Sequence, residues 1–391
     1  MSSKSPEFEI ADSISRVSPS EWNALDRGDF IFADHRFLLA LEESGSLGRR
    51  TGWHPTYLLA RQKGELVGAV PLFAKTNSYG EYIFDWSWAN AAHIAGDQYY
   101  PKLVAAIPFT PASGPKFLIK KGLSIRSQLA GQASSLSKSS EASSLHYLFI
   151  TPEEAAFLRD DGLAVRHSFQ YHWKNENWSN FEEFLGALRS KRRSEIKRER
   201  LGASQHGLEF QTLTGNQLTL EHARLMSLFY RSTTAKMGGM AYLTPRFFEL
   251  LVERMPEAIV FMLALDRGEP VAGALNLTGG KTLFGRYWGS TRDYKHLHFE
   301  LCYYRAIDWA LANGIQKFEA GAQGEHKFNR GFRPQLTLSA HLLMNPGLDR
   351  AVREFIEEEK LSIEEIFRDY QDHDPFQRID SRTQKDTDLG L

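Results

Sequence analysis

The length of 391 residues suggests two domains, and the 42% hydrophobic and 12% aromatic content excludes a disordered protein. The formal net charge of −1 excludes a molecule that attracts polyanions over its whole surface, so any nucleic-acid contact needs a local patch. Cys302 is the single cysteine, which excludes an intramolecular disulfide and a multi-cysteine zinc site.

The first half of the chain predicts mostly strands after residue 50. Two apolar runs, 57–60 and 66–73, flank a short turn that contains glycine and therefore predict a hairpin. Aromatic residues at 81–86 predict another strand. The serine-rich segment 123–144 predicts a helix rather than a linker, because an apolar strand at 146–150 follows it directly.

A strongly basic helix is predicted between the two halves, at residues 180–201. Ser179 followed by Glu182 fits the capping-box pattern at its start. The segment from Arg189 to Arg200 contains seven basic and two acidic residues, which gives it a net charge of +5. We interpret this helix as a surface that contacts a polyanion, with a solvated structural face as the alternative.

The second half repeats the order of the first. Residues 59–69 (LARQKGELVGA) resemble 263–274 (LALDRGEPVAGA), and Gly80-Glu81-Tyr82 matches Gly285-Arg286-Tyr287. Apolar residues from Phe299 to Asn313 recur at helical spacing, which makes this helix the counterpart of the serine-rich segment. The repeat predicts two homologous α/β domains.

The predicted boundaries follow from the repeat. The first domain spans residues 1–165, and the second spans 166–345 with the basic helix at 180–201. Residues 346–391 are predicted to form an acidic C-terminal helix and a flexible polar tail.

A loop rich in glycine and basic residues, Phe318–Pro334, ends the second copy. Its glycines allow tight turns and close approach of a ligand, and its cations could bind an anion or a developing oxyanion. The alternative is an ordinary solvated loop. The first copy follows its last strand with Thr151-Pro152-Glu153-Glu154 instead, so we assign anion binding to the second domain.

Several common catalytic motifs are missing from the sequence. It has no Walker sequence, no GxGxxG opening a βαβ unit, no GxSxG and no HExxH. His296 and His298, with Asp293 and Glu300 nearby, complete no familiar metal-ligand spacing, so we expect no metal site.

Five segments together resemble the Fem-like branch of the GNAT N-acyltransferase superfamily, and within it the predicted N-acyltransferases of peptidoglycan biosynthesis or recognition. They are GWHPTYLLAR (52–61), PFTPASGP (108–115), KRRSEIKRER (191–200), YWGSTRDY (287–294) and FEAGAQGEHKFNRGF (318–332). The resemblance implies a mixed α/β fold of two tandem GNAT-like domains. It also implies transfer of an acyl or aminoacyl group to an amine.

The resemblance implies a donor that binds as a cosubstrate, either aminoacyl-tRNA or acyl-CoA, rather than a permanently bound cofactor. A peptidoglycan precursor is one candidate acceptor, and tRNA is one candidate partner. The phosphate-binding [RQ]xxGx[GA] signature of acetyl-CoA users is absent, and Arg292–Leu297 occupies its place without glycines. Two alternatives therefore remain: a non-catalytic module that recognises cell-wall precursors or RNA, and a small-molecule acetyl-CoA N-acetyltransferase.

Aminoacyl transfer needs a neutral amine, a polarised carbonyl and a site for the oxyanion. Lys327 resembles a family lysine after a glycine-containing strand end, and it could stabilise the oxyanion together with Arg330 or backbone amides. The candidate proton acceptors are Glu319, Glu325, His326 and, from the first domain, Asp85. The candidate substrate- and anion-binding residues are Arg330, Arg333, Gly321, Gly324, Lys191, Arg192, Arg193 and Asp85.

We expect neither DNA as a partner nor a membrane span. No apolar run approaches the roughly 18 residues that cross a bilayer, and the N-terminal residues lack the apolar segment of a signal peptide. The sequence therefore predicts a cytoplasmic protein. It leaves the oligomeric state open.

Overall fold

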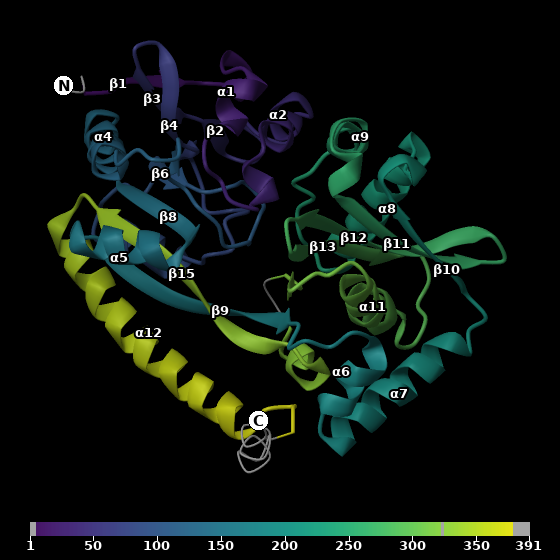
Figure 1. Cartoon of the computed structure of the whole chain (residues 1–391). Coiled ribbons are helices and arrows are strands. Elements are labelled where there is room, and N and C mark those ends of the chain that lie inside the picture. The colour runs from purple at the N-terminus through teal and green to yellow at the C-terminus, as the bar shows by residue number, and fades with distance from the viewer. Residues whose placement is uncertain (1–4, 322–323, 378–391) are drawn as a thin grey trace, which may run out of the picture.

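A computed structural model describes residues 5–321 and 324–377 as a mixed α/β protein (Figure 1). Its strands are β1 (Glu7–Ala11), β2 (Trp53–Pro55), β3 (Tyr57–Gln62), β4 (Glu65–Val70), β5 (Leu72–Lys75), β6 (Lys102–Ala105), β7 (Leu118–Ile119), β8 (Ser144–Ile150), β9 (Ala164–Lys174), β10 (Glu209–Thr214), β11 (Ile259–Asp266), β12 (Glu269–Gly279), β13 (Thr282–Ser290), β14 (Lys317–Glu319) and β15 (Arg333–Leu343). Its α-helices are α1 (Pro19–Asn23), α2 (His35–Glu43), α3 (Trp86–Ile94), α4 (Arg126–Ser139), α5 (Pro152–Asp160), α6 (Phe181–Ala187), α7 (Ser190–Ser204), α8 (Leu220–Lys236), α9 (Pro245–Arg254), α10 (Leu297–Phe299), α11 (Arg305–Ala312) and α12 (Pro346–Asp372).

The two matched hairpins of the sequence are the same structure. In β3–β4 the turn residues Lys63 and Gly64 have φ of 53° and 84°, and in β11–β12 Arg267 and Gly268 have φ of 54° and 81°. Two successive residues with positive φ are what a type I′ hairpin turn requires. The register also shifts at the same place, after Ala60 in one copy and after Ala264 in the other. The predicted correspondence of the hairpins is confirmed.

Each half also carries two parallel strands joined through a helix. In the first half β6 pairs in parallel with β8, and α4 lies between them in the chain. In the second half β13 pairs in parallel with β14, and the intervening helix runs through α10, a π-helical turn at Glu300–Tyr304 and α11. The predicted helix from Phe299, the predicted serine-rich helix and the strands after them are confirmed.

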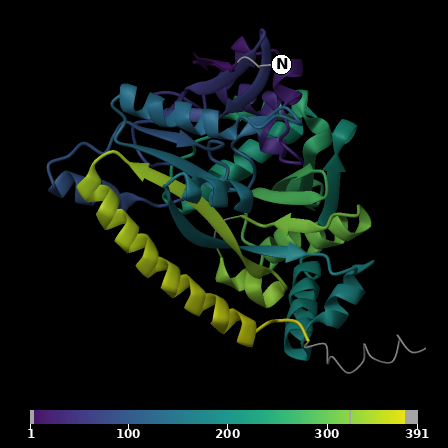
Figure 2. The same ribbon diagram turned by 60° about the vertical axis from the view of Figure 1, so that its left-hand side comes forward.

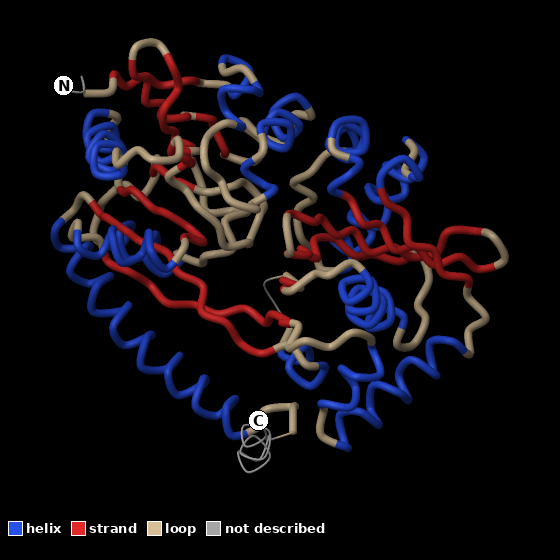
Figure 3. Tube along the Cα trace, viewed as in Figure 1, coloured by secondary structure: helices blue, strands red, loops and turns tan. Residues whose placement is uncertain are grey.

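The halves exchange their last strands. β9, from the first half, pairs with β14, while β15, from the second half, pairs with β8. β9 and β15 pair with each other from Arg333↔His172 to His341↔Ala164, which joins both halves into one eleven-stranded sheet, β10-β11-β12-β13-β14-β9-β15-β8-β6-β5-β2 (Figure 3). A four-stranded sheet, β1-β3-β4-β7, completes the first half. Because the large sheet is continuous, the predicted domain boundaries at 165 and 345 stay predictions.

A shared core and a long helix hold the halves together. The rings of Phe32 and Phe284 lie 5.0 Å apart, and those of Phe37 and Phe247 lie 5.7 Å apart, so α2 and its flanks pack directly on the second half. α12 runs along β9 and β15 on one outer side of the molecule (Figures 1 and 2). Residues 378–391 of the predicted tail lie outside the described residues. No helix in the described part of the chain is long and apolar enough to span a membrane.

The predicted strand at 81–86 is wrong. Residues 81–85 form a loop that leads into α3 rather than a strand, because Tyr82 has a φ of 61° and Glu81 and Asp85 turn inward to the buried ammonium of Lys102. The match of 80–82 with 285–287 therefore fails as well, since 285–287 lie in β13.

The basic segment is two helices rather than one. The chain breaks at Leu188, which is buried with an extended backbone (ψ 150°) and forms a β-bridge to Phe376. The first helix, α6, is capped by Asn180, which accepts the N–H of Glu183 at 3.0 Å, instead of by Ser179.

Candidate active site

β13 and β14 separate soon after they pair. The register runs through Thr282↔Lys317 and Phe284↔Glu319, after which β14 ends and β13 continues to Ser290. A bulge leaves Arg286 without a partner on β12. A cavity of about 90 Å³ occupies the gap, lined by residues 274–276, 285–288, 298, 302–303, 318 and 320, and we call it the β13–β14 cleft.

A larger cavity of about 540 Å³ adjoins this cleft and shares Arg286, Tyr287 and Trp288 with it. It lies between the halves and is lined by residues 78–80, 82, 84, 86, 111, 230, 233–234, 237, 239–240, 242, 286–288 and 321. Eight of these side chains are aromatic, so we call it the aromatic chamber. A third cavity, of about 340 Å³, meets the cleft at Trp288 and His298 and is also lined by Lys236 and Arg292.

The corresponding gap in the first half is closed. There the loop 108–116 lies against the end of β8: the N–H of Gly114 donates to the carbonyl of Phe149 at 3.0 Å. The buried ammonium of Lys116 donates to the carbonyls of Phe149, at 2.9 Å, and of Gly114, at 2.6 Å. The open cleft between parallel strands therefore belongs to the second half.

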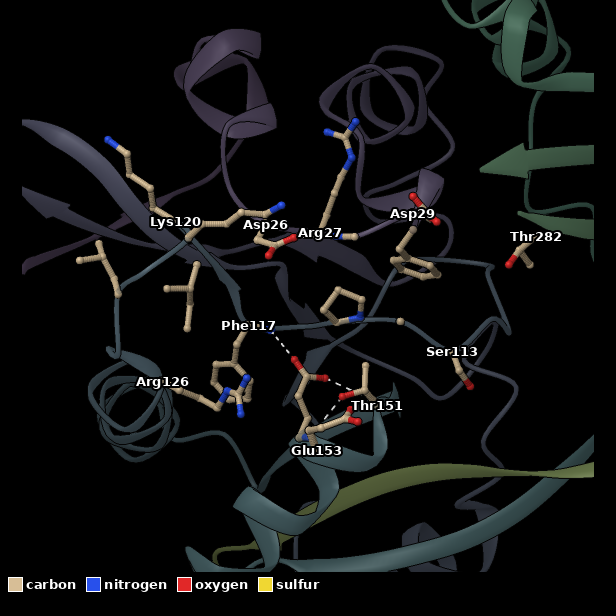
Figure 4. A pocket seen from close by; sticks show the side chains of 18 of the residues that line it. Asp26, Arg27, Asp29, Ser113, Phe117, Lys120, Arg126, Thr151, Glu153 and Thr282 are labelled. Atoms are coloured by element: carbon tan, nitrogen blue, oxygen red, sulfur yellow. Dashed lines mark hydrogen bonds between the residues drawn. The ribbon is translucent and has the colours of Figure 1, made fainter. Parts of the chain in front are cut away.

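A polar cavity of about 520 Å³ is lined mainly by the first half, with Thr282, Phe284 and Lys317 of the second half (Figure 4). Some of its polar side chains are engaged by other residues: the Glu154 carboxylate accepts the N–H groups of Lys116 and Phe117, and Lys120 pairs with Glu65. Arg27 pairs with Asp34 at 3.1 Å and points away from Thr151 and Glu153 in Figure 4. This cavity therefore offers less chemistry than the second-half cleft.

His298 is the histidine that lines the β13–β14 cleft. Its ring packs against Trp288 and Tyr303, with centroids 5.2 Å and 5.3 Å away. Burial, reinforced by the nearby His326 and Lys327, lowers the pKa of His298 to about 4, so the imidazole is neutral at pH 7. Cys302 also lines the cleft, but burial raises the pKa of its thiol, so it is no thiolate nucleophile.

From the sequence, His298 was a candidate only for metal binding. Across the described residues no group of three His, Cys, Asp or Glu side chains could hold a metal ion. The signal for its actual position was the i, i+4 spacing of His298 and Cys302, which places both on one side of the same helix.

The predicted catalytic residues occupy a 3₁₀ turn and the end of β14. Lys327 is buried, its ammonium donates to the carbonyl of Gly321 at 2.9 Å, and burial lowers its pKa to about 8. Glu319 is buried and pairs with Lys317 at 2.7 Å. Glu325 is exposed, and the His326 ring shares a hydrogen bond with the Tyr303 hydroxyl at 2.9 Å. Lys327 thus holds the carbonyl of Gly321, a residue that lines the chamber, and the catalytic roles of Lys327, Glu319, Glu325 and His326 stay predictions.

The predicted anion-binding arginines are neutralised within the protein. Arg330 is buried and forms two hydrogen bonds to Glu199, at 2.5 Å and 3.1 Å. Arg333 pairs with Asp374 at 3.0 Å and with Glu176. Gly321 and Gly324 take the positive φ, 83° and 114°, that their loop positions require. Residues 322–323 of this loop lie outside the described residues.

The remaining predicted residues lie on other elements. Lys191, Arg192 and Arg193 are on α7, where Arg192 pairs with Glu195 at 3.2 Å and Arg193 donates to the carbonyl of Gly186 at 3.3 Å. Asp85 is in the first half, and its carboxylate is held by Lys102 and by the Tyr99 hydroxyl, at 2.8 Å from the latter. Its role as a proton acceptor and those of the α7 cations stay predictions.

Comparison with known protein families gives one match that covers most of the chain. The model of the FemAB-like family, described as peptidoglycan biosynthesis/recognition, matches residues 13–378. The chain belongs to the FemAB-like family. Both the resemblance and the predicted fold class, a mixed α/β tandem GNAT-like fold with a long C-terminal helix, are confirmed.

Solved structures with this fold include FemX, which is 12% identical in sequence and superposes with a TM-score of 0.52. The superposition covers 89% of this chain and all of FemX. Another is the C-terminal domain of a provisionally named lysylphosphatidylglycerol synthetase from Agrobacterium fabrum, 12% identical over 87% of this chain and 94% of that one, with a TM-score of 0.52. A Mycobacterium tuberculosis protein with the provisional name 8-amino-7-oxononanoate synthase 2 is 27% identical over 196 residues, 48% of this chain. The match spans only a quarter of that relative's length.

Proposed function

We propose that this FemAB-like protein is an N-acyltransferase that moves a small acyl or aminoacyl group from an ester or thioester donor to an amine. The observation that carries the proposal is the β13–β14 cleft, which adjoins both the aromatic chamber and the cavity lined by Lys236 and Arg292. These two larger cavities also adjoin each other, since Thr233, Met237 and Trp288 line both. Two substrates bound in these adjoining cavities can thus both reach one small space. Holding both reactants in register supplies much of the rate of such a transfer.

The size of the cleft limits the acyl group. Its volume of about 90 Å³ is smaller than the ~150 Å³ apolar cavity that accepts benzene. The acyl group therefore has only a few non-hydrogen atoms, as in an acetyl or a small aminoacyl group. The phosphates common to acyl-CoA and aminoacyl-tRNA would lie beside Lys236 and Arg292, outside the cleft. Both cations are exposed and already pair with acids, Lys236 with Asp293 and Arg292 with Asp266 and Glu269, so a phosphate would have to compete with these surface ion pairs.

The reaction follows from the residues at the junction. The amine nitrogen attacks the donor carbonyl carbon, a C–N bond forms, and the nitrogen becomes cationic and acidic. Neutral His298 accepts the proton. Arg286 lines both cavities and donates one guanidinium N–H to the carbonyl of Phe109 at 2.5 Å, and its other N–H groups stabilise the oxyanion. When the oxyanion collapses, the C–O or C–S bond breaks and the leaving group takes up a proton.

The test is a product screen. The protein is incubated with acetyl-CoA, glycyl-tRNA, alanyl-tRNA or seryl-tRNA and a panel of amines, and amides are detected by mass spectrometry. We expect an amide that depends on protein, donor and amine. Binding of substrates with no amide from any donor would contradict the proposal and favour a non-catalytic recognition module.

Filling the cleft with one methyl group should slow the reaction. In a Gly285→Ala variant the new Cβ lies 3.1 Å from Phe318 Cε2 and 3.4 Å from the Cα of Ala320. We expect kcat/KM to fall about tenfold, roughly the 1.4 kcal/mol that one misplaced contact can cost. Gly131→Ala on α4, where a Cβ meets nothing within 4 Å, is the matched control. Equal activity of the two variants would contradict the placement of the acyl group.

A further inference from the structure

The aromatic chamber bears on which amine accepts the acyl group, an inference that rests on the proposed transferase function. Its rim is apolar and is supplied by both halves. Phe84 and Trp86 come from the loop and helix of the first half, and they are 54% and 42% exposed. Met237 and Met240 come from the segment after α8, and they are 80% and 39% exposed. Side chains this large, gathered around one cavity, mark a binding site for an apolar group.

The charges of the chamber argue against a polyanionic acceptor. Among the described residues that line it, Arg286 is the single cation and none carries a carboxylate or an imidazole. The guanidiniums of the nearby loop, Arg330 and Arg333, are already matched by Glu199, Glu176 and Asp374. A nucleotide-linked cell-wall precursor would bring a pyrophosphate and carboxylates, and buried charges of this kind need partners.

The same charges favour an uncharged amine. Burial among aromatic rings disfavours an ammonium, and the Arg286 guanidinium at the inner end of the chamber disfavours it further. An amine that enters the chamber therefore releases its proton to solvent and arrives at the cleft as the nucleophilic free base. The hydrocarbon part of the amine stays in the chamber, among the aromatic rings.

We propose that the acceptor is a hydrophobic primary amine, bound in the aromatic chamber as the neutral free base with its nitrogen directed to the β13–β14 cleft. The rings of Tyr230 and Tyr287, 4.9 Å apart and nearly edge to face, form the inner wall, and Tyr242 stacks on Phe109 at 5.0 Å to form another. These walls are packed in advance of binding, which limits the entropy lost when a ligand enters.

Calorimetry with 2-phenylethylamine, without any donor, tests the proposal. We expect binding to release a proton, measured in buffers of different ionisation enthalpy, and to tighten as the pH rises toward the pKa of the free amine. Phe84→Ala and Trp86→Ala should each weaken binding about tenfold, since each removes one ring of the rim. Leu361→Ala, an exposed apolar residue of α12, is the control and should change nothing. The two rim variants are at exposed positions and should keep the melting temperature of the parent protein.

Three results would overturn the proposal. Binding that weakens as the pH rises would mean that ring faces hold an ammonium instead. Binding indifferent to both rim variants would place the amine elsewhere. Binding of UDP-N-acetylmuramoyl pentapeptide, with none of 2-phenylethylamine, would make the acceptor a polyanion.

The same experiment separates this inference from the transferase proposal. Binding as expected, followed by no amide with any donor, would leave the acceptor class standing and contradict the transferase function. Amide formation on the pentapeptide alone would support the function and contradict the acceptor class.

Discussion

Replacing Arg330 by alanine is expected to lower the free energy of unfolding by about 3–5 kcal/mol, because it leaves a buried carboxylate without its partner. Glu199 and Arg330 are each 5% exposed, and Tyr304 also donates its hydroxyl to Glu199. The pair connects α7 to the loop after β14, two segments about 130 positions apart in the chain. Its loss should therefore loosen the loop as well as α7.

Urea unfolding at pH 7 followed by circular dichroism measures the effect. Lys191→Ala, an exposed cation of the same helix α7, is the control and should change stability by less than about 0.5 kcal/mol. The double variant Glu199→Leu with Arg330→Met removes both charges and should lose less than the sum of the single losses.

This prediction separates two interpretations of the basic loop. A residue that binds a substrate anion can be removed at little cost in stability, often with a gain. If Arg330→Ala kept full stability and lost substrate binding, the ion pair with Glu199 would be incidental, and the sequence-based assignment of Arg330 to anion binding would be favoured.

Features encoded by neighbouring residues could be predicted from the sequence. The two hairpins depend on Lys63-Gly64 and Arg267-Gly268, where glycine makes the left-handed backbone inexpensive at the second turn position. The helix that includes α11 was recognisable because its buried residues, such as Ala306 and Ala310, recur at helical spacing.

Features that depend on distant partners could not be predicted in this way. The aromatic run at 81–86 has strand propensity, but Lys102 binds Glu81 and Asp85 and turns the chain into a loop. The cations of the loop after β14 suggested an anion site because their partners, Glu199 and Glu176, are far away in sequence. The exchange of β9 and β15 could not be predicted from neighbouring residues, because each strand pairs with a partner from the other half of the chain.

The chamber and the cleft arise from the same long-range arrangement. Tyr82 belongs to one half and Tyr230 to the other. The residues beside each in the sequence indicate only an ordinary aromatic residue of the core. Only the packing of α2, α8 and α9 in one shared core brings these surfaces to face each other. The candidate site thus depends on how the two halves pack together, whereas the motif at 318–332 contributes only Phe318, Ala320 and Gly321 to its lining.

Replacing His298 by alanine is expected to reduce kcat about 10²- to 10⁴-fold, the usual loss when a positioned proton acceptor is removed. The reason is its location: it lines the β13–β14 cleft, where the attacking nitrogen must lose a proton. His326→Ala is the matched control. That histidine is exposed and does not line the cleft, although its ring lies 6.0 Å from that of His298, so its loss should cost less than about tenfold. Single-turnover rates with a saturating donor measure both variants.

The pH dependence gives a second, independent measurement. Burial lowers the pKa of His298 to about 4. Above that pH the ring is neutral and can accept a proton, and below it the ring is already protonated and cannot. The acidic limb of kcat should therefore fall as the pH drops through about 4, and this limb should disappear in His298→Ala while the residual rate stays flat. His298→Gln keeps the size and polarity of the side chain but cannot take up a proton, so it should be as slow as His298→Ala. A fast His298→Gln variant would show that the imidazole only fills the cleft, and a slow His326→Ala variant would move the proton acceptor to the loop after β14.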